Sequence, residues 1–590
     1  MIKDQKNFSK YILLFSGLLI LIISYLGYKN PVLSYELSIY NSTPMIIWVL
    51  YIIVLLFLYF VSIFMINNKT SKKIIHLLIY VSLMAHFIFL TLPYIRGYYT
   101  LGGDHITHSF IVKNLLLNGH IELTNIYPIS HIFATTLALF TNIDYNLIIN
   151  ISSTIFSLFF ILSLFCLGKL IISDQRTQII GFITSTCIFI TDYQIFFMPN
   201  GFSILYLPLI IYLFFRSIIH DKKEDWILFI LNIYLLIKFH PVSSLFVNIY
   251  FVIFIGVVYF AHQNFKNQIF GYNKIKNVIN IICFNIILFV VEFIFYTQYF
   301  YGNIRLIFLE FFGLTPNLYG LSANEKLTKM GFTLIDTIRY IIITHGQNLI
   351  LGFLSFLCFV LVYQNKLSLA LTRKYISYIL LGSIFLFGSL YSLAGLGLVP
   401  GSSGLDLIRL LPYSMIFAPI FTGIIISYYS NNRVKKIITI VILLSASTIS
   451  IINIFPSPYT YQPNPLTMKS EVIGCIYIKN YKIPETSTMI LSDSPDRIFT
   501  GILNQTDLFY FNLNYFNQVP DHFGYNINST LSSLKQEGFY LYYIKEDYIL
   551  YNTVYSPVGR YLYSDFNKLN NDINVNKCYT NNNVVFMFIN

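Results

Sequence analysis

The sequence is poor in charged residues. Only 11% of its 590 residues are Asp, Glu, Lys or Arg, whereas 56% are hydrophobic. Soluble globular domains have about 25% charged residues, so this composition excludes an ordinary soluble protein and predicts an integral membrane protein. The six cysteines show no CxxC or comparable spacing, which argues against a zinc or iron–sulfur framework. A P-loop for nucleotides and an internal repeat are also absent from the sequence.

Two of the cysteines, Cys475 and Cys578, lie in the polar C-terminal region. They could form a disulfide if this region faces an oxidising compartment. Two free, buried thiols are at least as consistent with the sequence, because spacing alone does not establish contact.

Long apolar runs dominate the first 455 residues. About 20 apolar residues cross a bilayer as a helix, and on this basis thirteen spans are predicted. The first run has no small-residue cleavage site, which favours an uncleaved helix over a signal peptide. The expected spans are 11–28, 45–66, 74–93, 145–172, 178–197, 202–217, 226–239, 241–261, 279–299, 340–363, 376–397, 407–428 and 437–455.

The positive charge is concentrated on one side of this expected topology. Alternate loops, counted from the N-terminus, hold 20 of the 38 Lys and Arg residues and five acidic residues, a net charge of +15. The rest of the chain has a net charge of −3, which gives the total of +12. Cytoplasmic loops carry the excess of Lys and Arg. The sequence therefore predicts a multi-pass protein of the cell membrane with a cytoplasmic N-terminus and an extracytoplasmic C-terminal region. It also makes nucleic acid an improbable partner for the positive charge.

Most of the residues outside the spans fall on the predicted outer side. Residues 94–144 and 300–339 form large loops of a transmembrane domain, 1–455, and residues 456–590 form a soluble domain. Short apolar strands and one helical stretch predict an α/β or α+β fold for that domain. Its aromatic segment 539–543 is interpreted as a core strand, the alternative being a surface that binds sugars.

The loop 94–144 gathers acidic and imidazole groups. Asp104 and His105 follow two glycines, and His108 and His131 come after them. If a helix begins after Gly103, Asp104 and His108 lie one turn apart on the same face. The alternative is that Asp104 caps the helix and the histidines are ordinary interfacial residues. The clustering favours a site.

The order of these features resembles the GT-C superfamily of integral membrane glycosyltransferases, which includes protein O-mannosyltransferases, aminoarabinose transferases and oligosaccharyltransferases. The features are many spans, Asp104 in the first large outer loop, Tyr-Pro-x-x-His at 127–131 and Asp-Leu-Ile-Arg-Leu-Leu-Pro-Tyr at 406–413. The chain departs from the pattern in having Gly-Asp-His where several subfamilies have paired acids. No cofactor follows with certainty, and a divalent metal (Mg or Mn) bridging Asp104 and His108 is left open.

The resemblance implies a transferase whose sugar donor is a polyprenyl phosphate and whose acceptor is an envelope glycan, lipid or protein. Asp104 would be the general base of an inverting displacement, with the histidines orienting the carboxylate or binding a substrate. A cation must stabilise the phosphate that leaves, for which Arg409 is the first candidate. Its alternative is an ion pair with Asp406. The weaker candidates are Lys238 and His240 for the phosphate, and Asp192, Glu122 and Arg339 as secondary residues.

Three other functions compete with this one. A polysaccharide polymerase or ligase would use a pyrophosphate-linked oligosaccharide and would need further outer arginines. A membrane transporter should show repeated span patterns in two halves. A non-catalytic scaffold would not need the histidine-rich loop.

Overall fold

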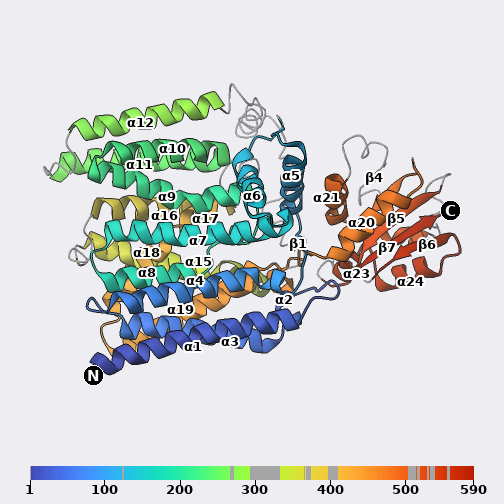
Figure 1. Cartoon of the computed structure of the whole chain (residues 1–590), viewed down its shortest axis with the longest axis horizontal. Helices are drawn as coiled ribbons and strands as arrows, with labels where there is room; N and C mark the ends of the chain where they lie inside the picture. Colours follow the sequence, from blue (N-terminus) through green and yellow to red (C-terminus); the bar gives the residue numbers. More distant parts are fainter. Residues whose placement is uncertain are drawn as a thin grey trace.

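The computed structural model describes most of the chain. The described residues are 2–122, 125–265, 272–292, 333–364, 366, 374–395, 410–484, 486–502, 513–514, 519–527, 531, 538–553, 559–581 and 583–590. They form a bundle of long helices and, at one end of it, a small domain built on a five-stranded sheet (Figure 1). The predicted fold class, a polytopic α-helical membrane protein with a C-terminal α/β or α+β domain, is confirmed.

Eight helices within the described ranges are long and apolar enough to cross a membrane. In the other apolar helices the stretch that meets the criterion among the described residues is shorter. The predicted count of thirteen spans therefore stays a prediction. The eight are α1 (Ile2–Lys29), α3 (Met45–Phe60) with its continuation η1 (Val61–Met65), α4 (Lys72–Ile95), α7 (Tyr145–Ile171), α9 (Pro199–His220), α15 (Leu334–Tyr363), α17 (Leu410–Met415) with α18 (Ala418–Tyr429), and α19 (Arg433–Ile454).

The predicted span 178–197 is helical only in its first half. Helix α8 (Gln175–Cys187) has 13 residues, about 20 Å of helix, which is too short for a hydrocarbon core of about 30 Å. The backbone becomes extended at Ile188, and the side chain of Gln194 accepts a hydrogen bond from the N–H of Ile190. This polar contact satisfies a backbone group outside the helix, so an apolar segment continues as a loop.

The break predicted at residues 240–241 is confirmed. Helix α10 (Lys223–Phe239) ends before His240, and α11 (Pro241–Phe265) begins at the proline, which has no N–H to donate to the preceding turn. Next come α12 (Tyr272–Val290) and, later, α16 (Lys374–Gly395). Of the predicted loop 300–339, residues 300–332 lie outside the described residues. Helix α15 begins at Leu334, before the predicted start.

The first large loop is mostly helical. After α4 it forms the short strand β1 (Thr100–Leu101), then α5 (Asp104–Asn118) and α6 (Pro128–Thr141). The helix predicted after Gly103 is therefore confirmed. Figure 1 shows α5 and α6 at the end of the bundle that faces the C-terminal domain, and the N-terminus at the opposite end.

The C-terminal domain has a mixed sheet. Its strand order is β4-β3-β5-β7-β6, with β3 parallel to both β4 and β5, and with β7 antiparallel to both β5 and β6. Helices cover the sheet. The elements are β2 (Leu466–Thr467), α20 (Lys469–Tyr481), β3 (Thr488–Ile490), α21 (Asp493–Ile502), β4 (Leu513–Asn514), β5 (Phe539–Ile544), α23 (Lys545–Tyr551), α24 (Tyr563–Asn571), β6 (Val575–Thr580) and β7 (Val584–Ile589).

Side chains inside this domain resolve two predictions. All six residues of β5 are buried, so the aromatic segment is a core strand and not a surface for sugars. Cys475 is buried against the hydroxyl of Tyr542, whereas Cys578 is exposed on β6, and both are free. The disulfide is therefore absent, and only one of the two free thiols is buried.

Two connections hold the bundle and the domain together beside α5. Strand β1 pairs with β2 in antiparallel register, Thr100 opposite Thr467. Ile106 of α5 belongs to the same buried cluster as Ile498 of α21 and Phe586 of β7. The loop between α4 and α7 therefore contributes to the core of the C-terminal domain.

Candidate functional site

The two glycines before Asp104 fix the path of the chain into α5. The N–H of Gly102 donates to the carbonyl oxygen of Pro465 at 2.6 Å, and a Cβ on Gly102 would lie 2.5 Å from that oxygen. Gly103 has φ +65°, a conformation that favours glycine. The two glycines thus allow a close crossing and a sharp turn, after which Asp104 opens the helix.

Asp104 does not cap α5. The N-cap is Gly103, with no side-chain capping bond, and Asp104 is the first helical residue, one position later than expected. A carboxylate is favoured there by the helix dipole. Its side chain is 58% exposed, and Oδ1 accepts a hydrogen bond from Nη1 of Arg497 at 2.7 Å.

Arg497 is a site residue that the sequence did not reveal. It lies on α21 of the C-terminal domain, and the same Nη1 also contacts the hydroxyl of Thr107 at 3.2 Å. Nothing in the surrounding sequence, Asp493 to Ile502, forms a known motif. Only the fold brings this guanidinium to Asp104.

His108 and His131 form a pair beside Asp104. Nδ1 of His108 lies 3.0 Å from Nε2 of His131, whose own Nδ1 lies 3.1 Å from the amide nitrogen of Asn125. Which ring donates and which accepts depends on the nitrogen that carries the proton in each histidine. Burial lowers the pKa of His108 to about 4 and that of His131 to about 3, so both are neutral at pH 7.

His105 meets different surroundings. It is fully buried, its Nδ1 accepts a hydrogen bond from the backbone N–H of Phe197 at 2.9 Å, and its Nε2 lies 3.2 Å from Oδ1 of Asn150. Burial lowers the pKa of His105 to about 3. Both ring nitrogens hold parts of the fold together, which is a structural role.

The segment before α9 supplies one wall of the site. The ring of Phe197 lies 6.5 Å from that of His108 and 6.3 Å from that of His131, between ring centroids. Asp192 begins the short helix η2 (Asp192–Gln194) in the same segment, is exposed, and accepts a hydrogen bond from the hydroxyl of Thr191.

Two candidates for binding phosphate lie at the break between α10 and α11. Lys238 forms an ion pair with Glu292, and both side chains are partly exposed. His240 packs its ring 4.9 Å from the ring of Tyr127, the residue that precedes α6. The break therefore contacts the helix that carries His131.

The remaining candidates are not brought to Asp104 in the described part of the chain. Arg409 lies outside the described residues, as does Asp406. Glu122 is exposed in the connection between α5 and α6, and Arg339 is exposed on the second turn of α15. Asp336, three residues before Arg339, forms a capping box with Thr333.

The side chains beside Asp104 offer few ligands for a metal ion. Among the described residues, no three His, Cys, Asp or Glu side chains are grouped as ligands. Asp104 and His108 offer one carboxylate and one imidazole, and a guanidinium already contacts that carboxylate. A positive charge there disfavours a divalent cation, so the arrangement does not fit Mg²⁺ or Mn²⁺. The metal that the sequence left open at Asp104 and His108 therefore gains no support from this donor set.

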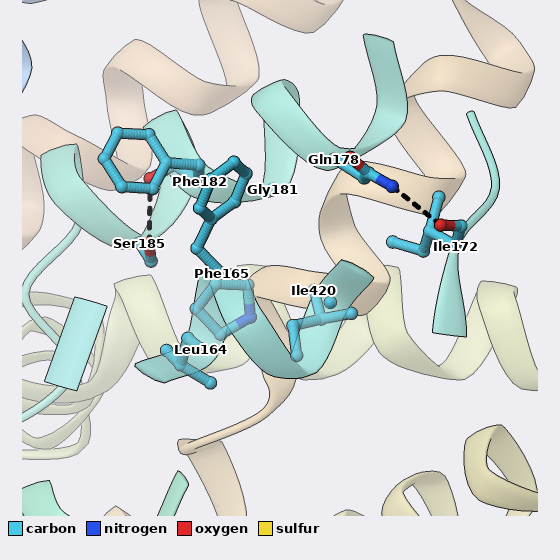
Figure 2. A pocket seen from close by; sticks show the side chains of 10 residues that line it. Leu164, Phe165, Ile172, Gln178, Gly181, Phe182, Ser185 and Ile420 are labelled. Carbon is cyan, nitrogen blue, oxygen red and sulfur yellow. Dashed lines mark hydrogen bonds between the residues drawn. The ribbon is translucent and has the colours of Figure 1, made fainter. Parts of the chain in front are cut away.

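An apolar crevice lies far from this site. Figure 2 shows it between α7, α8 and α18, on the part of α7 away from its start beside α6. Its lining contains no acidic or basic side chain, so it offers no acid–base chemistry. The lining residues are Leu164, Phe165, Gly168, Ile172, Gln178, Gly181, Phe182, Ser185, Pro419 and Ile420.

Comparison with known proteins gave similar solved structures only. No family model and no curated protein matches the chain. The archaeal oligosaccharyltransferase AglB from Archaeoglobus fulgidus, in complex with an inhibitory peptide and a dolichol-phosphate, is similar with TM-score 0.46 and 10% identity, over 89% of this chain and 72% of that one. ArnT from Cupriavidus metallidurans, bound to undecaprenyl phosphate, is similar with TM-score 0.35 and 10% identity, over 88% and 98%. Both are members of the GT-C superfamily, which the sequence resembles.

Proposed function

We propose that the chain is a membrane glycosyltransferase that takes a sugar from a polyprenyl-phosphate donor and transfers it, with inversion, to a glycan, lipid or protein on the outer face of the membrane. The observation that carries the proposal is the Asp104 carboxylate. It is exposed at the start of a helix at the end of the bundle, makes no capping bond and is held by Arg497. A carboxylate serving only the helix would not need this partner.

In the proposed reaction Asp104 is the general base. The acceptor hydroxyl oxygen attacks the anomeric carbon from the face opposite the phosphate, and its proton moves to the Asp104 carboxylate. The bond between the anomeric carbon and the phosphate oxygen breaks, and the polyprenyl phosphate leaves with the electron pair. A single displacement inverts the anomeric centre.

The histidine pair and nearby cations would serve the substrates. His108, neutral and bound to His131 through Nδ1, would present its Nε2 to a hydrogen-bonding group of the substrate. Arg409 remains the proposed cation for the leaving phosphate, with Lys238 and His240 as alternatives. His240 is supported by its ring contact with Tyr127, which precedes α6. Lys238 lies two residues before His240 and would have to exchange Glu292 for the phosphate.

The test starts with a deletion strain of the host. Its lipid-linked sugars and surface glycans should show loss of a sugar and accumulation of the corresponding lipid-linked carrier. The wild-type chain should restore the missing sugar, whereas Asp104→Asn should not, although both proteins are present in the membrane in equal amounts. Asp521→Asn is the matched control, because Asp521 is another exposed acid paired with an arginine, Arg560, in the C-terminal domain. Unchanged glycans together with a transport defect would reject the proposal. If Asp104→Asn restores the glycans, Asp104 is not the general base, but the proposed transfer reaction stands.

A further inference from the structure

The helices that carry Asp104 and Arg497 are held by a common core. Ile106, two residues after Asp104, is 2% exposed, and Ile498, next to Arg497, is 1% exposed in the same cluster. Phe110, one turn further along α5, packs on this cluster too. The backbones of both partners are therefore fixed without help from their charges.

The ion pair itself is directional. Nη1 of Arg497 contacts Oδ1 of Asp104 at 2.7 Å and the Thr107 hydroxyl at 3.2 Å. Two acceptors one turn apart on α5 thus orient a planar guanidinium. This single hydrogen bond to Oδ1 leaves acceptor capacity on the carboxylate for the proton of the acceptor hydroxyl.

We propose that Arg497 is a positioning residue for Asp104, so that the C-terminal domain completes the active site of the transmembrane domain. This rests on the proposed function, in which Asp104 accepts the proton. A purely structural pair at this exposure would stabilise the fold only slightly, because water screens the attraction between exposed charges. The joint core already supplies the docking that such a pair would otherwise provide.

The test uses the full-length protein in proteoliposomes. The donor is the lipid-linked sugar purified from the deletion strain. Arg497→Gln should lower kcat about tenfold to a hundredfold, the range expected on losing a charge-assisted hydrogen bond, with the KM for the donor within about twofold of wild type. Arg497→Lys keeps the charge but loses the two-acceptor geometry, so its kcat should be intermediate.

Arg560→Gln is the matched control. Arg560 pairs with the exposed Asp521 at 2.6 Å in the same domain and has similar exposure, but it does not contact α5. Its kcat should stay within about twofold of wild type. If Arg497→Gln loses no more kcat than this control, Arg497 has no positioning role. An increase in donor KM with unchanged kcat would instead make it a donor-binding residue, which also overturns the proposal.

A second variant covers the case in which Arg497→Gln does not fold. Thr107→Val removes one acceptor of Arg497 but leaves the ion pair, and a decrease in kcat of about threefold to tenfold is expected. Wild-type kcat in Thr107→Val would overturn the proposal. If the wild-type protein itself transfers no sugar, the proposed function fails, which is a different result from either of these.

Discussion

At the residue scale, His105 and His108 are three positions apart on α5 but differ in what surrounds their nitrogens. Both nitrogens of His105 bind other elements, Asn150 of α7 and the backbone before α9, and the ring is fully buried. His108 pairs with His131 and lies one turn from Asp104. One histidine therefore holds the site together, and the other can meet a substrate.

The structural role of His105 predicts a pH-dependent stability. Its pKa of about 3 is below the value of about 6.5 in an unfolded chain. The unfolded state therefore binds a proton first as the pH falls, and the free energy of unfolding decreases between about pH 7 and pH 4. At pH 5 the loss from this group is about 2 kcal/mol.

His105→Gln should isolate that contribution. At pH 7.5 the variant should be less stable by about 1–3 kcal/mol, because the N–H of Phe197 loses its acceptor. At pH 5 the difference in stability from wild type should be smaller, because protonation of His105 in the unfolded state destabilises only the wild type. Thermal unfolding in detergent at the two pH values measures this. A constant difference, or full loss of transfer in a stable His105→Gln protein, would contradict the structural role.

The sequence predicted part of the site because its signals are local. Asp104, His108 and His131 lie within 28 residues, and helical spacing correctly predicts that Asp104 and His108 share a face of α5. Arg497 could not be found this way, since it is 393 positions from Asp104 in the chain. The role of His105 was also hidden, because its partners come from other elements.

At the element scale, the turn between β1 and α5 connects the two parts of the molecule. Gly102 packs against the carbonyl oxygen of Pro465, immediately before β2, so a methyl group there collides with backbone and not with a flexible side chain. Such overpacking costs roughly 1–3 kcal/mol. The strain falls on the β1–β2 pairing, two residues from Asp104.

Gly102→Ala should therefore loosen the C-terminal domain and lower transfer at least about tenfold. Limited proteolysis should cut near residues 456–468 faster than in wild type. Gly17→Ala is the control, because a Cβ on this helical glycine of α1 meets nothing within 4 Å. It should be neutral or slightly stabilising. Normal proteolysis and activity in Gly102→Ala would show that the crossing tolerates a Cβ.

Element prediction succeeded where apolar patterns are strong. Strands β5 and β7 are apolar, as the short strands predicted for this domain are, whereas β6 was missed because its sequence, Val-Asn-Lys-Cys-Tyr-Thr, is mostly polar and exposed. The helix predicted over 178–197 ends early for the opposite reason. Its apolar residues are buried among neighbouring helices, and an apolar run does not by itself distinguish a helix from a buried loop.

At the scale of the whole molecule, the basic loops meet at one end. The side chain of Arg176 donates hydrogen bonds to the carbonyl oxygens of Ile63 and Ser430, which precede two other basic loops. The N-terminus and the C-terminal domain lie at opposite ends of the bundle (Figure 1), the arrangement that thirteen spans would give. The charge asymmetry then predicts which end is cytoplasmic.

The exposed thiol of Cys578 provides a test of that orientation. In a background with Cys166→Ser and Cys283→Ser, which removes the other exposed or partly exposed thiols, a membrane-impermeant maleimide added to intact cells should label the chain if the C-terminal domain faces outward. Cys578→Ser should then abolish the labelling, because Cys475 is buried. For the opposite side, Asn68→Cys in the Cys578→Ser background adds a thiol to an exposed basic loop that should react only after the membrane is opened. The reverse pattern would put Asp104 and Arg497 on the cytoplasmic side. Nucleotide-sugars are available there, and the argument for a lipid-linked donor would fail.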